Sequence, residues 1–231
     1  MEYYYMYYVS GIIILPVFIF ALICQLKVKS SFNKYSKIMS KSNMTGADAA
    51  WRLLQLNGVT DVKIQRIGGT LTDYYDPSQK VICLSSDVFD SRSIAAIGVA
   101  CHEAGHAVQH AESYSPLKIR NAVIPATRIG SALGIPLCLI GMFINSVTLA
   151  YIGVGLYALV ALFQLLTLPV EFNASTRALQ TIETNGFLSA EEYTGAKKVL
   201  TAAALTYVAA LASALATILR LLIVISGGRR R

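Results

Sequence analysis

The sequence predicts a mainly α-helical integral membrane protein, with about four transmembrane helices and a small α+β layer outside the bilayer. Of its 231 residues, 55% are hydrophobic and only 14% are charged, which is unlike an ordinary soluble domain. The apolar residues gather in long runs, and a polar segment with short alternating patterns lies between two of them. Such runs can cross a bilayer, and the alternating patterns are typical of strands.

Two further observations narrow the class of protein. The net charge of +7 comes without interleaved aromatic and basic residues, so nucleic acid is not an expected partner. The four cysteines show no C-x-x-C spacing, which predicts buried thiols and neither a disulfide framework nor a cysteine zinc site. We therefore expect the basic residues to face lipid headgroups and to set the topology.

Residues 1–26 predict an N-terminal transmembrane anchor. Val9–Leu26 is apolar and carries no charge, which is long enough for one crossing. The only earlier charge is Glu2, so the basic start of a cleaved signal peptide is missing and we expect an uncleaved anchor. Five lysines follow between residues 27 and 41, a cluster that marks the cytoplasmic side of a membrane.

Residues 27–128 predict a cytoplasmic α+β region. Thr45 and Asp48 form a helix start, and the helix should cover Ala47–Leu56 with Trp51 on its buried side. A strand is expected at Val59–Ile67, where apolar and polar residues alternate.

Val81–Leu84 predicts a second short strand. Two interpretations stay open for it: an edge strand that pairs with an extended peptide, or an ordinary core strand.

A second helix is predicted from near Asp90 to near Ser113, and it contains the segment His102-Glu-Ala-Gly-His106. Residues four apart lie on one side of a helix, so His102 and His106 can bind one metal ion together. Glu103 stands beside them and can take a proton from a zinc-activated water. The pattern therefore predicts one catalytic Zn²⁺ with Glu103 as the general base, in a zincin-like α+β layer.

Residues 129–170 predict a transmembrane hairpin, because they form a run without any charged side chain that suits two spans. We expect spans at Ile129–Ile144 and Val147–Leu168, with the turn at Asn145-Ser146. A hairpin returns the chain to the side that it left. Glu171 should therefore emerge on the face of the membrane that carries the two histidines.

Residues 171–199 predict a second cytoplasmic segment, and residues 200–231 predict a C-terminal transmembrane helix with a basic tail. Four spans would carry this tail outside, whereas its three terminal arginines favour the inside. The side on which the tail lies stays open.

A catalytic zinc site needs a third protein ligand. His110 continues the spacing of the histidines, but on a straight helix it lies about 12 Å along the axis from His102, too far to share one ion. Glu171 is the predicted ligand, because an unpaired carboxylate at the end of a long apolar span is costly. Four other carboxylates are alternatives: Glu112, Glu183, Glu191 and Glu192. Glu112 lies too far along the motif helix, and the other three are expected to be exposed.

Over nearly its whole length the sequence resembles the YugP-like membrane zinc metallopeptidases of bacteria. The matching segments are Met44-Thr-Gly-Ala, Leu71-Thr-Asp-Tyr-Tyr-Asp-Pro, Val81-Ile-Cys-Leu-Ser, Arg92-Ser-Ile-Ala-Ala, His102-Glu-Ala-Gly-His-Ala-Val-Gln-His, Tyr114-Ser-Pro-Leu, Pro169-Val-Glu-Phe-Asn-Ala-Ser and Ala203-Ala-Leu-Thr-Tyr-Val. The layout is also similar to that of HtpX-type membrane proteases.

The resemblance implies a multi-pass cell-membrane peptidase with a cytoplasmic active site. It also implies that His102, His106 and Glu171 are the zinc ligands and that Glu103 is the catalytic base. The sequence departs from the expected pattern at Tyr74, where histidine is expected, and at Asn173, where aspartate is expected. If the carboxylate at 173 orients a zinc-bound histidine, asparagine should hold it less strongly.

The sequence thus predicts an integral membrane zinc endopeptidase. Its expected partners are a peptide or protein substrate, membrane proteins included, and the lipid bilayer. Arg177, Tyr193 and Tyr207 are candidate donors to the negative charge that develops during hydrolysis. The alternative is a non-catalytic zinc-binding membrane scaffold or chaperone-like protein. A transporter would need polar or charged groups inside its spans, and the predicted hairpin has no charged residue.

Overall fold

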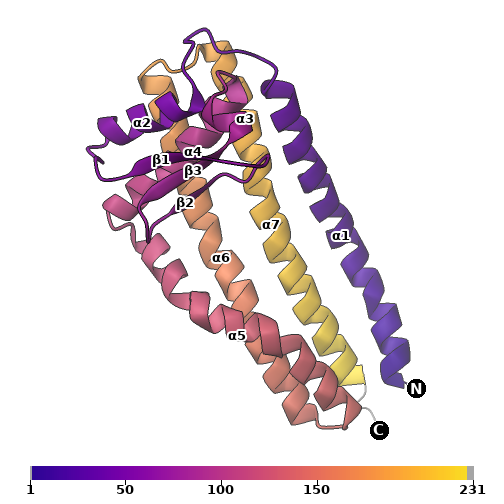
Figure 1. Ribbon diagram of the computed structural model, residues 1–231. Helices are drawn as coiled ribbons and strands as arrows, with labels where there is room; N and C mark the ends of the chain where they lie inside the picture. The colour runs from indigo at the N-terminus through magenta and orange to yellow at the C-terminus, as the bar shows by residue number, and fades with distance from the viewer. Residues whose placement is uncertain (1, 228–231) are drawn as a thin grey trace. The chain divides into compact units, whose positions relative to one another are not determined.

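A computed structural model describes residues 2–227 of the chain (Figure 1). The described residues are mainly helical, as the sequence predicts, and they include a small three-stranded sheet, of which the sequence predicts two strands. It packs as two compact units. The first holds Met1–Cys24, Lys118–Leu168 and Thr206–Arg231, and the second holds Gln25–Leu117 and Pro169–Leu205. The basic tail at residues 228–231 lies outside the described residues. The predicted boundaries of the chain segments describe where the chain enters and leaves the membrane, and they stay predictions.

Four helices of the described chain are long and apolar enough to cross a membrane. They are α1 (Glu2–Tyr35), α5 (Ser115–Phe143), α6 (Val147–Thr184) and α7 (Ala190–Gly227). α5 begins well before the predicted start of its apolar span, and α6 continues well beyond the end of its own. An apolar run marks only the predicted membrane border, whereas backbone hydrogen bonds decide where a helix ends.

A tight turn around Asn145 joins α5 to α6, as predicted. The φ angle of Asn145 is 55°, in the left-handed region that asparagine tolerates better than most residues. The two backbones approach closely in the first unit, since a Cβ atom added to Gly153 would lie 2.3 Å from the amide nitrogen of Cys138. Small residues allow such close packing between membrane helices.

In the second unit, α2 (Gly46–Leu56) begins at the predicted capping box. Thr45 Oγ1 accepts from the N–H of Asp48, and Asp48 Oδ2 accepts from the N–H of Thr45, both at 3.0 Å. Trp51 is 58% exposed, so its predicted burial is wrong. Leu54 lies at the margin of the buried stripe of this helix. Trp51 falls beyond that margin because each residue advances the helix by about 100°.

The sheet has the strand order β1-β3-β2. β3 (Val81–Ser85) is buried at every position and pairs in parallel with β1 (Lys63–Ile67) and antiparallel with β2 (Tyr74–Asp76). β3 is therefore a central strand, and the possibility that it is a free edge is excluded. β2 was not predicted, because its three residues lie within a turn-rich segment. β1 begins at Lys63 and not at Val59.

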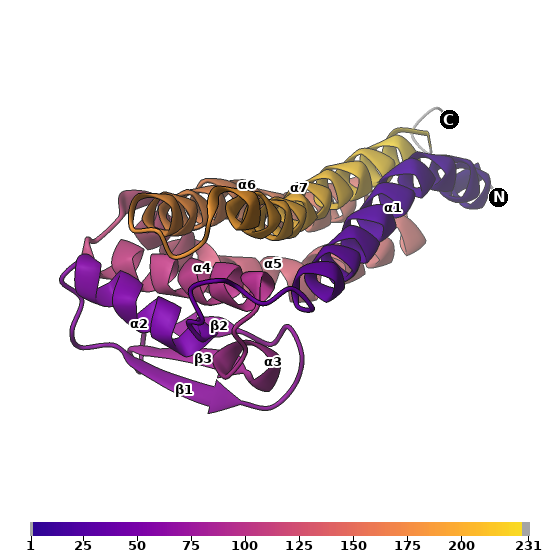
Figure 2. The ribbon, with the colours of Figure 1, turned by 90° about the horizontal axis from the view of Figure 1, so that it is seen from above.

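A short helix, α3 (Ser86–Phe89), leads from β3 to the motif helix α4 (Ile94–Ala111). α4 begins later than predicted, at a cap where Ser93 Oγ accepts from the N–H of Ala96 at 3.2 Å. It contacts α2, β2 and β3, and Figure 2 shows it between the sheet and the second-unit part of α6. The motif helix is thus held on two sides within the second unit.

Candidate functional site

The histidines of α4 face the same direction. His102 and His106 are one helix turn apart, and their ring centroids lie 4.7 Å from each other. On the other side of the same helix, Cys101 and Ala104 are fully buried in the core of the second unit. Burial of that apolar side fixes the rotation of α4 about its axis, which in turn fixes the direction of the imidazoles.

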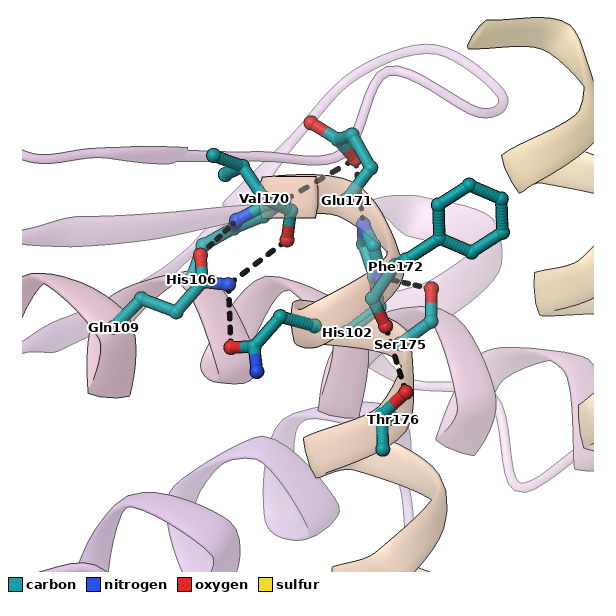
Figure 3. A network of polar contacts seen from close by, with 9 residues as sticks. His102, His106, Gln109, Val170, Glu171, Phe172, Ser175 and Thr176 are labelled. Atoms are coloured by element: carbon teal, nitrogen blue, oxygen red, sulfur yellow. Dashed lines mark hydrogen bonds and ion pairs between the residues drawn. The ribbon is translucent and has the colours of Figure 1, made fainter. Parts of the chain in front are cut away.

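Glu171 on α6 reaches both imidazoles (Figure 3). Its Oε2 lies 3.3 Å from His102 Nε2 and 3.5 Å from His106 Nε2. The carboxylate is buried, with 4% of the residue exposed. The three donor atoms lie within 4.8 Å of one another, so the structure brings together the three residues that the sequence predicts as ligands.

A glycine allows this approach of α6 to α4. A Cβ atom added to Gly105 would lie 2.7 Å from the carbonyl oxygen of Ala174, closer than van der Waals contact permits. The two backbones therefore touch at the centre of the motif. Any larger residue at 105 would separate the histidines from Glu171.

The donor set fits a zinc ion. Zinc binds imidazole nitrogen and carboxylate oxygen at about 2.0–2.1 Å in tetrahedral sites, which places neighbouring ligand atoms roughly 3.3 Å apart. The distances of Glu171 Oε2 from His102 Nε2 and His106 Nε2, 3.3 and 3.5 Å, match that edge length. Two imidazoles and one carboxylate also leave a tetrahedral ion one further position for a water.

Glu103 is buried on α4 beside His102. Burial raises the pKa of Glu103, and the negative charges of Glu171 and Asp73 raise it further, whereas the two histidines lower it. The balance leaves the pKa above the ordinary value. A carboxylate with a raised pKa accepts a proton more readily, which suits a general base.

The pKa of His106 is raised as well. Burial lowers it, but the contact with Glu171 and the charge of Glu103 outweigh burial. The carboxylates around this imidazole therefore favour a cation in their midst. A metal ion can supply that positive charge in place of a proton, because it binds the neutral form of histidine.

Two residues that the sequence analysis did not single out hold the far nitrogens of the imidazoles. Ser175 Oγ lies 3.0 Å from His102 Nδ1, and Gln109 Oε1 lies 3.0 Å from His106 Nδ1. The spacing contains a signal for both. Gln109 follows His106 by three residues and Ser175 follows Glu171 by four, so each lies on the site-facing side of its helix.

Asn173 reaches His106 through Gln109. Its Oδ1 accepts from Gln109 Nε2 at 2.9 Å and from Arg177 Nε at 2.7 Å. The presence of asparagine in place of aspartate at this position therefore affects the His106 imidazole only indirectly, through Gln109. Arg177 also pairs with Glu112 at 2.7 Å, so this candidate charge donor and this candidate ligand are engaged with each other.

The other candidate ligands lie elsewhere. His110 Nδ1 is 2.8 Å from the hydroxyl of Tyr75, beside a cavity of about 300 Å³, and His110 is not part of the three-donor cluster. Glu183 and Glu191 are exposed, as expected. Glu192 is buried, which corrects its predicted exposure, because its carboxylate accepts from the backbone N–H groups of Lys41 and Ser189.

The second departure, Tyr74, lies on β2 with 48% of its surface exposed. Its neighbour Asp73 is fixed by Ser85, whose N–H and hydroxyl donate to Asp73 Oδ1 at 2.7 and 3.0 Å. Burial raises the pKa of Asp73, although these hydrogen bonds oppose the shift. The negative charge of Asp73 also raises the pKa of Glu103, so the start of β2 belongs to the surroundings of the site.

Comparisons with known proteins show the family to which the chain belongs. The pattern of a family described as "Putative neutral zinc metallopeptidase" matches residues 10–226. The chain is 48% identical over 205 residues to the "Putative membrane protease YugP" of Bacillus subtilis (strain 168), which covers 89% of this chain and 91% of that protein. No solved structure matches the chain at a significant level. The chain therefore belongs to the family described as putative neutral zinc metallopeptidases.

Proposed function

We propose that the protein is an integral membrane zinc-dependent endopeptidase, in which Glu103 is the general base. The observation that carries the proposal is the convergence of His102, His106 and Glu171 at the spacing of zinc ligands, with Glu103 beside them. Family membership supports the same activity, since the relatives are described as a zinc metallopeptidase and a membrane protease.

The residues of the site have different roles in hydrolysis. A zinc ion held by the three donors supplies a Lewis acid, which makes a water more acidic and a peptide carbonyl more electrophilic. The Glu103 carboxylate accepts the proton of the attacking water and then donates it to the leaving amine nitrogen. Ser175 and Gln109 hold the imidazoles in place from behind.

We place the site on the cytoplasmic side of the cell membrane. Thirteen Lys or Arg residues lie between residues 27 and 128, and none lies between residues 129 and 170. Positive charge concentrates on the cytoplasmic side of membrane proteins. The four long apolar helices support a multi-pass arrangement. We also propose that the α+β layer is zincin-like, because the motif helix packs on a small mixed sheet.

The test is hydrolysis of an unfolded protein by the full chain purified in detergent, with the zinc content measured on the same sample. We expect about one zinc per chain, loss of hydrolysis after chelation and recovery when zinc is restored. Zinc without hydrolysis would favour the non-catalytic scaffold. A chain that contains no zinc and takes up none would contradict the site itself.

A further inference from the structure

Gln109 is the only glutamine on α4 and is fully buried, with 0% of the residue exposed. Its side chain has three polar contacts. Oε1 lies 3.0 Å from His106 Nδ1, and Nε2 lies 2.8 Å from the carbonyl oxygen of Val170 (Figure 3). Nε2 also lies 2.9 Å from Asn173 Oδ1. A buried amide in such surroundings must satisfy its donors and its acceptor within the protein.

The chemistry of its partners fixes the orientation of this amide. The Val170 carbonyl can only accept a hydrogen bond, so the Gln109 atom that faces it must be the NH₂ group. The contact with Asn173 indicates the same orientation of the Gln109 amide. Arg177 can only donate, so the Asn173 atom that it contacts must be the oxygen, and this oxygen also receives Gln109. Gln109 Oε1 is left facing His106.

An amide oxygen can only accept, so His106 must donate from Nδ1. A neutral imidazole carries one proton. With that proton on Nδ1, the lone pair of His106 lies on Nε2, the nitrogen that faces Glu171 Oε2 at 3.5 Å. Gln109 therefore selects the tautomer in which His106 can bind a metal ion on the side where the other two donors converge.

The same side chain holds α6 at the third donor. Val170 directly precedes Glu171, and its carbonyl receives the Gln109 amide. We propose that Gln109 is a positioning residue, which fixes the tautomer of His106 and the place of Glu171 with one amide group. This inference rests on the proposed zinc site, and it assigns a role that the three ligands do not explain.

Ser175 offers a contrast. Its hydroxyl lies 3.0 Å from His102 Nδ1, but a hydroxyl can either donate or accept. Ser175 therefore supports His102 without selecting its tautomer. Loss of Gln109 should accordingly weaken zinc binding more than loss of the Ser175 hydroxyl.

The test measures zinc affinity of the full chain in detergent, by competition with a chromophoric chelator. Gln109→Met keeps the length of the side chain and removes all three hydrogen bonds. We expect it to weaken zinc binding by about 10–100-fold, the effect typical of partners behind a ligand. Ser175→Ala should weaken it less. Wild-type affinity in Gln109→Met would overturn the proposal.

Two control variants separate positioning from general packing. Val108→Ala removes two methyl groups from a buried side chain, 1% exposed, at the neighbouring position of the same helix. It should lower the unfolding temperature of the zinc-free protein and leave zinc affinity unchanged. Asn173→Asp keeps an oxygen that accepts from Gln109, so this variant should bind zinc at least as tightly as the wild type. A loss in either control as large as that in Gln109→Met would contradict a specific role for Gln109.

A measurement on the wild type covers the case in which Gln109→Met does not fold. The chain has three histidines, so ¹⁵N-histidine labelling gives few imidazole signals to assign. In the zinc-loaded protein we expect His106 to carry its proton on Nδ1, and a proton on Nε2 would overturn the proposal. Failure of the wild type to bind zinc would instead remove the proposed function. Zinc bound equally well without Gln109 would remove only this inference.

Discussion

The two histidines differ in how firmly their surroundings orient them. His106 donates to a fully buried amide oxygen, whereas His102 meets a hydroxyl on α6. Both place Nε2 toward Glu171 Oε2, which lies within 3.5 Å of each. At the scale of single residues, the centre is therefore a set of three donors with two supporting contacts behind them.

Replacement of Glu171 tests its role as the third ligand. Glu171→Ala leaves two imidazoles, and zinc affinity should fall by orders of magnitude because a zinc site needs three protein ligands. His110→Ala is the matched comparison. His110 contacts Tyr75 and lies outside the cluster, so its loss should cost at most the roughly 10–100-fold of an indirect partner.

Zinc stoichiometry of the two purified variants decides between them. Empty sites in Glu171→Ala and zinc retained in His110→Ala would agree with the structure. A full complement of zinc in Glu171→Ala, together with empty sites in His110→Ala, would show that His110 is the ligand.

The sequence predicts these donors because helix geometry is regular. Spacing alone places His102 and His106 on one side of a helix, and the length of the apolar run indicates where Glu171 emerges. The partners behind the donors could not be predicted in the same way. Ser175 reaches His102 only because α4 and α6 meet in one register, and no local pattern encodes that register. Gln109 lies on the same helix as His106, but its contacts with Val170 and Asn173 depend on the same register.

At the scale of elements, Gly105 sets the separation of α4 and α6. A Cβ atom at this position would meet the Ala174 carbonyl oxygen at 2.7 Å. Gly105→Ala should therefore destabilise the fold by about 1–3 kcal/mol, as overpacking does, and weaken zinc binding because Glu171 moves away from the histidines. Thermal unfolding and zinc affinity of the purified variant measure the two effects.

Gly98→Ala is the control on the same helix. Its Cβ atom would lie 3.4 Å from that of Ala196, an ordinary contact. Both substitutions gain the same helix propensity, about 1 kcal/mol, so the difference between them isolates the steric clash. Equal stability and equal zinc affinity in the two variants would contradict the close approach at Gly105.

The elements themselves were predicted to different degrees. The capping box at Thr45 and the turn at Asn145 were found from local chemistry, because both depend on residues adjacent in sequence. β2 was missed, since a three-residue strand exists only through its pairing with β3. The same pairing decided that β3 is central, which its own residues left open.

At the scale of the whole molecule, α6 contains both a predicted apolar span and Glu171 of the proposed site. The helix is continuous from Val147 to Thr184, and Glu171 follows the predicted span, which ends at Leu168, by about 4.5 Å along the axis. We therefore expect the proposed site to lie near the border of the membrane. We propose that this border lies on the cytoplasmic side, because positive charge is concentrated between residues 27 and 128.

Cysteine labelling tests this orientation. All four native cysteines are buried, so their background reaction should be low. With a thiol reagent that does not cross the membrane of intact cells, Thr60→Cys should stay unlabelled and Ile144→Cys, at the hairpin turn, should react. Both positions are exposed. Labelling at position 60 with protection at 144 would show that the orientation is the reverse.

Replacement of Glu103 tests the proposal that this protein hydrolyses peptide bonds with Glu103 as the base. Glu103→Gln preserves the shape of the buried side chain but cannot accept a proton, whereas the three zinc donors remain. The variant should therefore bind zinc as the wild type does and lose activity by at least the ~10²–10⁴-fold that general-base catalysis contributes.

The most direct measurement compares hydrolysis of an unfolded protein by wild type and Glu103→Gln at equal zinc content. We expect cleavage by the wild type and a loss of at least ~10²-fold in the variant. Near-normal cleavage by zinc-loaded Glu103→Gln would contradict the proposed mechanism.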